Sequence, residues 1–495
     1  MSVMYTRCAG LDVHRDTVAA CIRTRLVGGE YQEQRETFGT CNADLRRLAC
    51  WLRDHQIRQV AMESTGVYWI PIWNTLEASR YRFQPLLVNP VQVRALAGRK
   101  TDQIDCGRIA EYLQHGRLAG SFIPPPVVRE ARALERYRVH LQQDRNRAIN
   151  RIERLLQSAG IKLSTTLSNI VGLSGRRILA ALAQGQSDRA KLAQLVHDRV
   201  QASQSEIMQA LEGDYSEHFR YMLGQLLEEY DRLTQKLEEI TGRLATYMAA
   251  HAELVQRMCQ VPGVDKLTAW TVLAEVGSDL SAFPDAAHFV SWVALCPGNN
   301  ESAGKRKQGR TRKGNCYLRR ALVQAAWAAA HSKGTYLSAL FLRFARRQGM
   351  KKAAVSVAHR ILVILYYIIR DGVSYLEKGD DYFDRQHPER TARRLLQRLD
   401  RLGYETAHIT PKGVSPERPV CPPRTPRRGR PCKCAERGLA CPHASAVAPQ
   451  PDPKKEPDDA AVGCRMCAVW HIRCIHVRPK IKRRPKPAPP PPHVE

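Results

Sequence analysis

The sequence has no uncharged apolar stretch long enough to cross a membrane. Its longest such stretch, residues 361–369, is far shorter than the ~20 residues that span a bilayer. The N-terminus also lacks the apolar region of a secretory signal, because Arg7, Asp12 and Arg15 interrupt it. We therefore expect no membrane segment and a cytoplasmic location, where thiols stay reduced.

Acidic residues are scarce relative to basic ones. The 495 residues include 77 Lys and Arg but only 48 Asp and Glu, which gives a formal net charge of +29 and an isoelectric point near 9.8. A surplus of this size indicates a polyanionic partner, and nucleic acid is the commonest one. With 43% hydrophobic residues, the chain is too long for one small module and too apolar for a disordered or collagen-like protein.

Proline is sparse over the first 410 residues and abundant after them. Residues 411–495 hold 19 of the 29 prolines, together with 18 basic and 7 acidic residues, and such a composition does not readily bury a core. We therefore predict that 379–495 form a basic tail, rich in proline and cysteine and largely disordered. The cysteines that lie singly upstream are expected to be buried thiols.

The tail contains one pattern that suggests a metal. Cys464 and Cys467, followed by His471 and Cys474, would suit a tetrahedral Zn²⁺ site. The interval from Cys467 to His471 is short for a zinc finger, which weakens this interpretation. The favoured alternative is a disordered basic arm that adds nonspecific affinity for nucleic acid.

The N-terminal part alternates between short strands and helices. Such interspersed elements favour an α/β domain over 5–125. The predicted elements are a strand, a turn and a second strand within 7–23, further strands at 59–62 and 86–88, and helices at 42–55 and 67–79.

Two long helical patterns fill the next region, 126–254. The first, 127–158, is strongly basic and could lie along phosphate groups. The second, 225–248, has apolar residues at spacings of 4, 3, 4, 3 and 4, which is a coiled-coil seam and suggests oligomerisation. An amphipathic helix packed on its own domain fits this pattern equally well. The seam residues are Leu226, Tyr230, Leu233, Leu237, Ile240 and Leu244.

A mostly helical domain is expected over 255–378. It begins with Val261-Pro262-Gly263-Val264, which resembles the turn of a helix-hairpin-helix. Gly263 would let that turn approach the DNA backbone, so that its amides bind phosphate. An ordinary turn between two helices is the equally weighted alternative.

Four acids stand where metal ligands would be useful. Asp12 closes the first predicted strand, Glu63 closes the strand at 59–62, and Asp102 and Asp105 lie three residues apart at the start of a helix. Gathered carboxylates repel one another unless cations neutralise them, and all-oxygen sites prefer Mg²⁺ or Mn²⁺. Paired ions of this kind support phosphoryl transfer. Any single acid could instead be a helix cap or a solvated surface group.

Ser302 lies in a small-residue segment that leads into a basic run. A serine hydroxyl facing this much positive charge could attack a phosphate. The alternative is a flexible, solvated basic loop that grips backbone phosphates. The candidate nucleic-acid-binding residues in this run are Lys305, Arg306, Lys307, Arg310, Arg312 and Lys313.

Together these motifs resemble the DEDD-type insertion-sequence transposases related to the Piv/MooV invertases. The resemblance covers about 7–375, with the motifs in the expected order. They are Gly10-Leu11-Asp12-Val13-His14, Met62-Glu63-Ser64-Thr65-Gly66-Val67-Tyr68, Val88-Asn89-Pro90, Lys100-Thr101-Asp102-Gln103-Ile104-Asp105, Val261-Pro262-Gly263-Val264, Ser302-Ala303-Gly304-Lys305 and Lys313-Gly314-Asn315.

The resemblance implies a ribonuclease-H- or RuvC-like domain whose four acids hold Mg²⁺, followed by a helical domain that supplies Ser302. In such proteins the serine is thought to form a covalent phosphoserine link to double-stranded DNA. Homodimers or homotetramers assemble the sites, and a structured noncoding RNA guides recombination in a nucleoid-associated, prokaryotic setting. Two departures are notable: Ala303 stands where many relatives have glycine, and the tail from about 380 has no counterpart.

The expected function is therefore that of a DNA recombinase using Mg²⁺ or Mn²⁺ and Ser302. One alternative is a metal-dependent, structure-specific endonuclease of the Holliday-junction type, with Ser302 as a phosphate ligand only. Another is a non-catalytic, architectural nucleic-acid-binding protein whose acids are structural.

Overall fold

The structure is a computed structural model that describes residues 3–63, 66–90, 102–296, 301–302, 305–306, 311, 314–406 and 409. The side chains of 102–105, 301–302 and 305–306 lie outside this description. The chain divides into two compact units. The first comprises Met1–His331 and Gln348–Leu376, and the second comprises Ser332–Arg347 and Glu377–Glu495.

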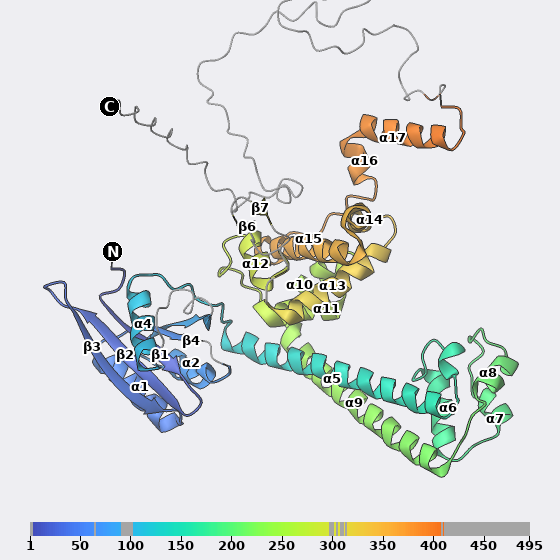
Figure 1. Cartoon of the computed structure of the whole chain (residues 1–495), viewed down its shortest axis with the longest axis horizontal. Coiled ribbons are helices and arrows are strands. Elements are labelled where there is room, and N and C mark those ends of the chain that lie inside the picture. The colour runs from blue at the N-terminus through green and yellow to red at the C-terminus, as the bar shows by residue number, and fades with distance from the viewer. Residues whose placement is uncertain are drawn as a thin grey trace, which may run out of the picture. The chain divides into compact units, whose positions relative to one another are not determined.

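The N-terminal part is built on a five-stranded mixed sheet in the order β3-β2-β1-β4-β5 (Figure 1). Strands β1 (Arg7–Val13), β2 (Thr17–Arg25) and β3 (Tyr31–Gly39) pair antiparallel, whereas β4 (Gln59–Glu63) and β5 (Gln84–Val88) continue from β1 in parallel. The four predicted strands are confirmed. Strand β3 was not predicted, because almost all of its residues are polar and it forms an exposed edge.

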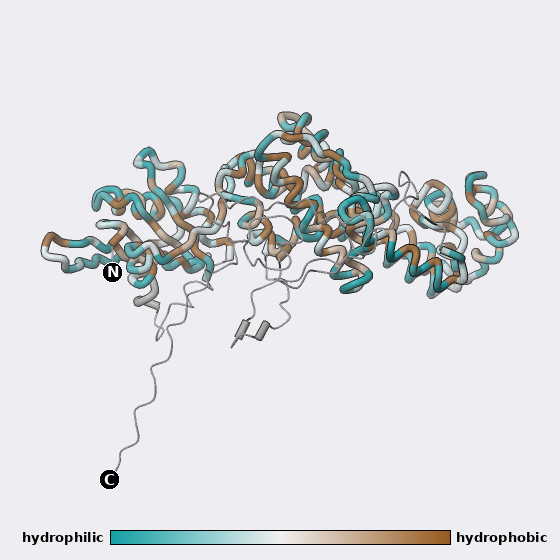
Figure 2. Tube along the Cα trace, turned by 90° about the horizontal axis from the view of Figure 1, so that it is seen from above, coloured by the Kyte–Doolittle hydropathy of each residue, from teal (hydrophilic) through white to brown (hydrophobic). Residues whose placement is uncertain are grey.

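Helices cover both faces of this sheet. Helices α1 (Asn42–Asp54) and α2 (Trp69–Glu77) pack on the face that carries Leu11 and Val60. Helix α4 (Asp102–Gln114) packs on the opposite face, which carries Cys8 and Ala61. Figure 2 shows hydrophobic and hydrophilic residues interspersed in the part of the chain near the N-terminus. Strand β1 is buried from Cys8 to Val13, as a central strand covered on both faces should be.

Two helices of equal length, α5 (Pro126–Ser158) and α9 (Glu217–Ala249), run side by side. The predicted seam of α9 is real, but α5 of the same chain fills it. The buried contact joins Leu141 and Ala148 of α5 to Leu233, Leu237 and Ile240 of α9. The alternative of an amphipathic helix packed within its own chain therefore accounts for this pattern.

A small helical subdomain lies between the long helices in the sequence. It has its own core, in which Ile152 and Leu156 of α5 and Leu223 and Leu227 of α9 take part. Its elements are η1 (Leu163–Thr165), α6 (Leu173–Ala183), α7 (Arg189–Ala193) and α8 (Gln204–Ala210).

The next part of the first unit is almost wholly helical, as predicted. Its elements are α10 (Ala252–Cys259), α11 (Lys266–Val276), α12 (Ala286–Val293), α13 (Cys316–His331), α15 (Met350–Asp371) and a short hairpin of β6 (Glu301–Ser302) and β7 (Lys305–Arg306). Helix α15 is long and apolar enough to cross a membrane, but 61% of its most apolar window is buried inside the protein. Residues such as Val357, Ile361 and Leu365 of α15 are core residues.

The second unit contains α14 (Tyr336–Gln348), α16 (Tyr382–Gln386) and α17 (Pro388–Arg401). The ring of Tyr336 packs against the rings of Tyr382 and Phe383, at centroid distances of 5.2 and 5.5 Å. Ordered helices therefore extend about 20 residues beyond the predicted start of the tail at 379. The cysteine-rich part of the tail lies outside the described residues.

Candidate active site

Asp12 and Glu63 lie next to each other at the carboxyl ends of neighbouring strands. Strands β1 and β4 are parallel, and Leu11 pairs with Met62, so the following residues are Asp12 and Glu63. Side chains alternate between the faces of a strand. Asp12 therefore shares the face of Cys8 and Gly10, which is the face covered by α4. Asp12 is 8% exposed and Glu63 is half-buried.

Helix α4 runs antiparallel to β1 and begins beside Asp12. The thiol of Cys8 donates to the carbonyl oxygen of Ala110 at 3.3 Å, and a Cβ placed on Gly10 would lie 2.2 Å from the carbonyl oxygen of Cys106. Two residues of a strand and four residues of a helix both span about 6 Å, so the step from Cys8 to Gly10 along β1 matches the step from Ala110 back to Cys106 along α4. The next step along β1 reaches Asp12, and the matching step along α4 reaches Asp102 in its first turn.

The first turn of α4 begins at Asp102 and includes Asp105. Asp102 lies four residues before Cys106, and Asp105 lies four residues before Ile109; both Cys106 and Ile109 are buried against the sheet. The backbone register thus brings the segments that carry all four predicted acids to one edge of the sheet. The side chains of Asp102 and Asp105 themselves lie outside the described residues.

Electrostatic interactions around Asp12 support this neighbourhood. The pKa of Cys106 is lowered to about 7, chiefly by a hydrogen bond with Cys21, while the negative charge of Asp12 acts in the opposite direction. Asp12 therefore lies close enough to Cys106, in the first half of α4, for the two groups to interact electrostatically. On the solvent side, Nε2 of His14 lies 3.1 Å from Oδ2 of Asp12. This imidazole belongs to the Gly10–His14 motif, but its contact with Asp12 could not be read from the sequence.

The donor set suits a hard divalent cation. Asp12 and Glu63 offer carboxylate oxygens, which Mg²⁺ and Mn²⁺ prefer to nitrogen or sulfur. Asp12 is nearly buried at the end of its strand, and an ionised carboxylate in that position gains from a cation. Among the described side chains, no three His, Cys, Asp or Glu groups gather closely enough to hold an ion. That set does not include the side chains of Asp102 and Asp105.

Ser302 lies in the β6–β7 hairpin, opposite Lys305. The hairpin lies in the segment between α12 and α13, and Gly314, near the end of that segment, packs against the end of α12. A Cβ on Gly314 would lie 2.5 Å from Cβ of Ala294 and 2.9 Å from the carbonyl oxygen of Val293. The segment that follows α12 thus returns to α12 before α13 begins. Of the six predicted basic contacts, Lys305 and Arg306 lie on β7, whereas Lys307, Arg310, Arg312 and Lys313 lie outside the described residues.

Gly263 is used for packing in this structure. Its φ of +84° is one that glycine adopts readily. A Cβ there would lie 2.2 Å from the carbonyl oxygen of Ala325 and 2.6 Å from the amide nitrogen of Ala329, both in α13. The turn between α10 and α11 therefore presses against a helix of its own chain. This geometry favours an ordinary helical turn, and a DNA contact at Gly263 stays a prediction.

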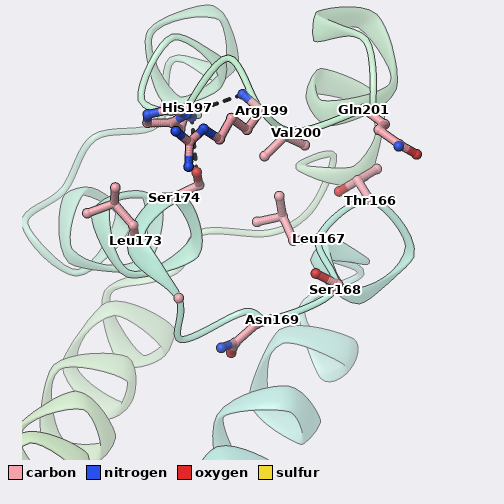
Figure 3. Close-up of a pocket in the computed structure, with 11 residues that line it drawn as sticks. Thr166, Leu167, Ser168, Asn169, Leu173, Ser174, His197, Arg199, Val200 and Gln201 are labelled. Carbon is pink, nitrogen blue, oxygen red and sulfur yellow. Dashed lines mark hydrogen bonds between the residues drawn. The ribbon is translucent and has the colours of Figure 1, made fainter. Parts of the chain in front are cut away.

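A separate cavity with both polar and apolar lining residues lies in the small helical subdomain (Figure 3). It has a volume of about 530 Å³. Two hydrogen bonds order its wall: His197 donates its amide to Oγ of Ser174 at 3.0 Å, and Arg199 donates its amide to Nδ1 of His197 at 3.2 Å. It contains none of the predicted site residues.

Comparison with known protein families gives two matches, one in the N-terminal part of the chain and one in the helical part that carries Ser302. Residues 9–161 match a DEDD transposase model of the IS110 type, which implies a RuvC-like fold and use of a divalent metal. Residues 255–341 match the model described as Transposase IS116/IS110/IS902 family. The first segment contains all four predicted acids, and the second contains Gly263 and Ser302.

Three curated relatives agree with these matches. The chain is 26% identical over 300 residues to the transposase for insertion sequence element IS1111A of Coxiella burnetii, which covers 58% of this chain and 72% of that protein. It is 28% identical over 153 residues to the putative transposase y4pF/y4sB of Sinorhizobium fredii, covering 30% and 39%. It is 31% identical over 120 residues to the insertion element IS110 uncharacterized 43.6 kDa protein of Streptomyces coelicolor, covering 24% and 29%.

Asp12 and Glu63, at the edge of the sheet, lie within the first matched segment. The hairpin with Ser302 lies within the second. The chain is a DEDD-type insertion-sequence transposase, an enzyme that transposes DNA.

Proposed function

We propose that this transposase cleaves and rejoins DNA strands with Ser302 as the nucleophile, assisted by Mg²⁺ or Mn²⁺ held by Asp12, Glu63, Asp102 and Asp105. The proposal of a metal site rests on one observation. Asp12 and Glu63 lie on the same face of the sheet at the ends of adjacent strands, and α4 begins beside them at Asp102. The cation supplies charge that stabilises the phosphate oxygens in the transition state.

The reaction is a phosphoryl transfer. The hydroxyl of Ser302 gives up its proton, and its oxygen forms a bond to phosphorus. The bond from phosphorus to the departing deoxyribose oxygen breaks, and that oxygen takes up a proton. Lys305, opposite Ser302 in the hairpin, and Arg306 offer positive charge to the phosphate. Reversal of this step on a second strand would complete the exchange.

The charge of the chain suits binding to nucleic-acid backbones. The net charge of +29 favours contacts to phosphate that do not depend on sequence. We propose that a noncoding RNA supplies target choice by base pairing in the cytoplasm, and that the enzyme acts as a homodimer or homotetramer. Because α5 fills the seam of α9, subunits would meet through other surfaces.

The test compares two substitutions in the full chain. We expect Ser302→Ala and Asp102→Asn each to lower strand exchange by at least about 1,000-fold, because each removes a group required for chemistry. DNA binding should stay within about threefold. A protein–DNA adduct that maps to Ser302 by mass spectrometry should form in the parent and be absent from Ser302→Ala.

The matched control is Ser281→Ala, a serine of the same domain whose hydroxyl donates to the carboxylate of Asp279, two residues earlier. It should retain full activity. If Ser302→Ala still cleaves DNA while Asp102→Asn does not, the enzyme uses water as its nucleophile. The serine mechanism would then be wrong and the endonuclease alternative right.

A further inference from the structure

A fully buried carboxylate joins α11 to the basic helix α5. Glu275 is 0% exposed, and both of its oxygens accept hydrogen bonds from Arg136, from Nε at 2.7 Å and from Nη2 at 2.9 Å. Nε of Arg132 lies 3.2 Å from Oε2 of Glu275, and Arg132 also donates to the backbone carbonyl of Glu275. Burial lowers the pKa of Arg132 to about 10, and Glu275 opposes this shift. Arg132 therefore stays charged at neutral pH.

The same carboxylate also binds the residue that starts α13. Nδ2 of Asn315 donates to Oε2 of Glu275 at 2.7 Å. Oδ1 of Asn315 accepts from the amides of Tyr317 and Leu318, each at 3.1 Å, which caps the helix. Glu275 thereby fixes which way the Asn315 amide points, because only its nitrogen can donate to a carboxylate.

Asn315 directly follows the segment that carries Ser302. Gly314, one residue earlier, is pressed onto the end of α12. Two contacts therefore fix the downstream end of the segment between α12 and α13, which carries Ser302. They are the packing of Gly314 on α12 and the hydrogen bond from Asn315 to Glu275. Through Arg132 and Arg136 this second contact continues into α5, which leads back to the metal-site domain in the sequence.

We infer that Glu275 is a positioning residue that ties the downstream end of the segment carrying Ser302 to α5, and so limits where that segment can lie relative to the DNA. This inference rests on the proposed role of Ser302. Glu275 touches no substrate itself; it acts through Asn315. Orientation of a nucleophile contributes strongly to rate, and a small misplacement far from the chemistry can cost about 100-fold.

The chain offers a closely matched control at the same interface. Glu135 of α5 is also 0% exposed, and it is bound by Arg138 at 2.7 and 2.8 Å. It accepts a further hydrogen bond from Oγ1 of Thr271 in α11 at 2.7 Å. Neutralising either glutamate leaves buried arginine charge with a poorer partner. Glu275 differs from Glu135 in being bound by two arginines, Arg132 and Arg136, and in accepting a hydrogen bond from Asn315.

The experiment compares Glu275→Gln with Glu135→Gln in the full chain, below the melting temperature of both. We expect both variants to lose thermal stability, Glu275→Gln the more, because it leaves two arginines with a poorer partner and Glu135→Gln leaves one. The rate of strand cleavage at saturating DNA should fall about 100-fold for Glu275→Gln and less than about threefold for Glu135→Gln. The Kd for DNA should stay within about threefold for both. Equal rates in the two variants would overturn the inference.

A second variant guards against poor folding of Glu275→Gln. Asn315→Ser keeps an oxygen that can cap α13 but removes the amide donor to Glu275. It should lower the cleavage rate as Glu275→Gln does, and the double variant should be no slower than either alone, since both weaken the same contact: Asn315→Ser removes the amide donor, and Glu275→Gln leaves one uncharged acceptor oxygen. Additive losses, or parent-like cleavage by Asn315→Ser, would refute the coupling.

These outcomes separate this inference from the proposed nucleophile. If Ser302→Ala remains active, the proposed function fails. If Ser302→Ala is inactive but Glu275→Gln and Asn315→Ser cleave like Glu135→Gln, the proposed function stands and only the positioning role is wrong.

Discussion

Single residues decide how closely α4 approaches the candidate carboxylates. Gly10 has no side chain, so the backbone of α4 at Cys106 and Ala110 can lie directly against β1. Cys8 adds a thiol donor to the same stretch of helix, and burial raises the pKa of that thiol to about 12, so it stays protonated. The sequence motif around Asp12 is thus structural in part: it makes room for the helix that carries Asp102 and Asp105.

Gly10→Ala should displace α4 and disturb the metal site. Its Cβ would meet backbone atoms at 2.2 and 2.4 Å, and backbone atoms cannot move aside as a side chain can. We expect a loss of about 1–3 kcal/mol in stability, as for an overpacked core, with a strong loss of strand cleavage. Thermal unfolding and a cleavage assay measure the two effects.

Gly224→Ala is the control for this prediction. Gly224 lies within α9, and a Cβ there meets nothing within 4 Å. Alanine favours a helix over glycine by about 1 kcal/mol, so this variant should be slightly more stable and fully active. Parent-like activity of Gly10→Ala would contradict the close approach of α4 to β1.

At the scale of elements, the pairing of α5 with α9 explains why an apolar seam need not mean a dimer. Heptad spacing requires only that another helix fill the seam. Here that helix comes from the same chain. Leu233 and Leu237 of α9 pack with Leu141 of α5.

Leu237→Ala should therefore lower stability without changing the number of subunits. Leu237 is 8% exposed, and truncating a buried leucine costs about 2–5 kcal/mol. Differential scanning calorimetry measures the stability, and light scattering of the native protein measures the mass. A lower mass at a temperature where the variant is still folded would show that the seam joins subunits after all.

At the scale of the whole molecule, positive charge extends along the sequence from the basic helix α5 to the tail. Helix α17, which has no buried residue, carries Arg390, Arg394, Arg398 and Arg401 at spacings of four, four and three, so these lie along one face. Residues 411–495 add 18 basic against 7 acidic residues. Neither region overlaps the segments that match the transposase models.

Removing residues 411–495 should weaken DNA binding more at low salt than at high salt. The tail would contribute through phosphate contacts, and such contacts release counterions. The slope of log Kd against log salt concentration should therefore become shallower, whereas a cut within an uncharged segment would not change it. DNA-binding titrations at salt concentrations from about 50 to about 300 mM measure this slope. An unchanged slope would show that the tail does not touch nucleic acid.

The sequence by itself determined the local elements and the candidate chemistry. Hydrophobic residues recur every second position in strands and every three to four positions in helices, and these patterns depend only on residues close together in the sequence. Strands β1, β2, β4 and β5 and helices α5 and α9 could therefore be predicted. The polar edge strand β3 lacks such a pattern and was missed. The acids and Ser302 were singled out by residue type and placement, and their roles remain predictions.

Only the tertiary structure decided which distant segments meet. It paired Leu11 with Met62, pressed Gly263 against α13 and filled the seam of α9 with α5. It also buried Glu275 among Arg132, Arg136 and Asn315, contacts that span up to 143 residues of sequence. Such choices depend on packing and on satisfying buried charge between elements far apart in the chain, and a local pattern carries no record of the partner.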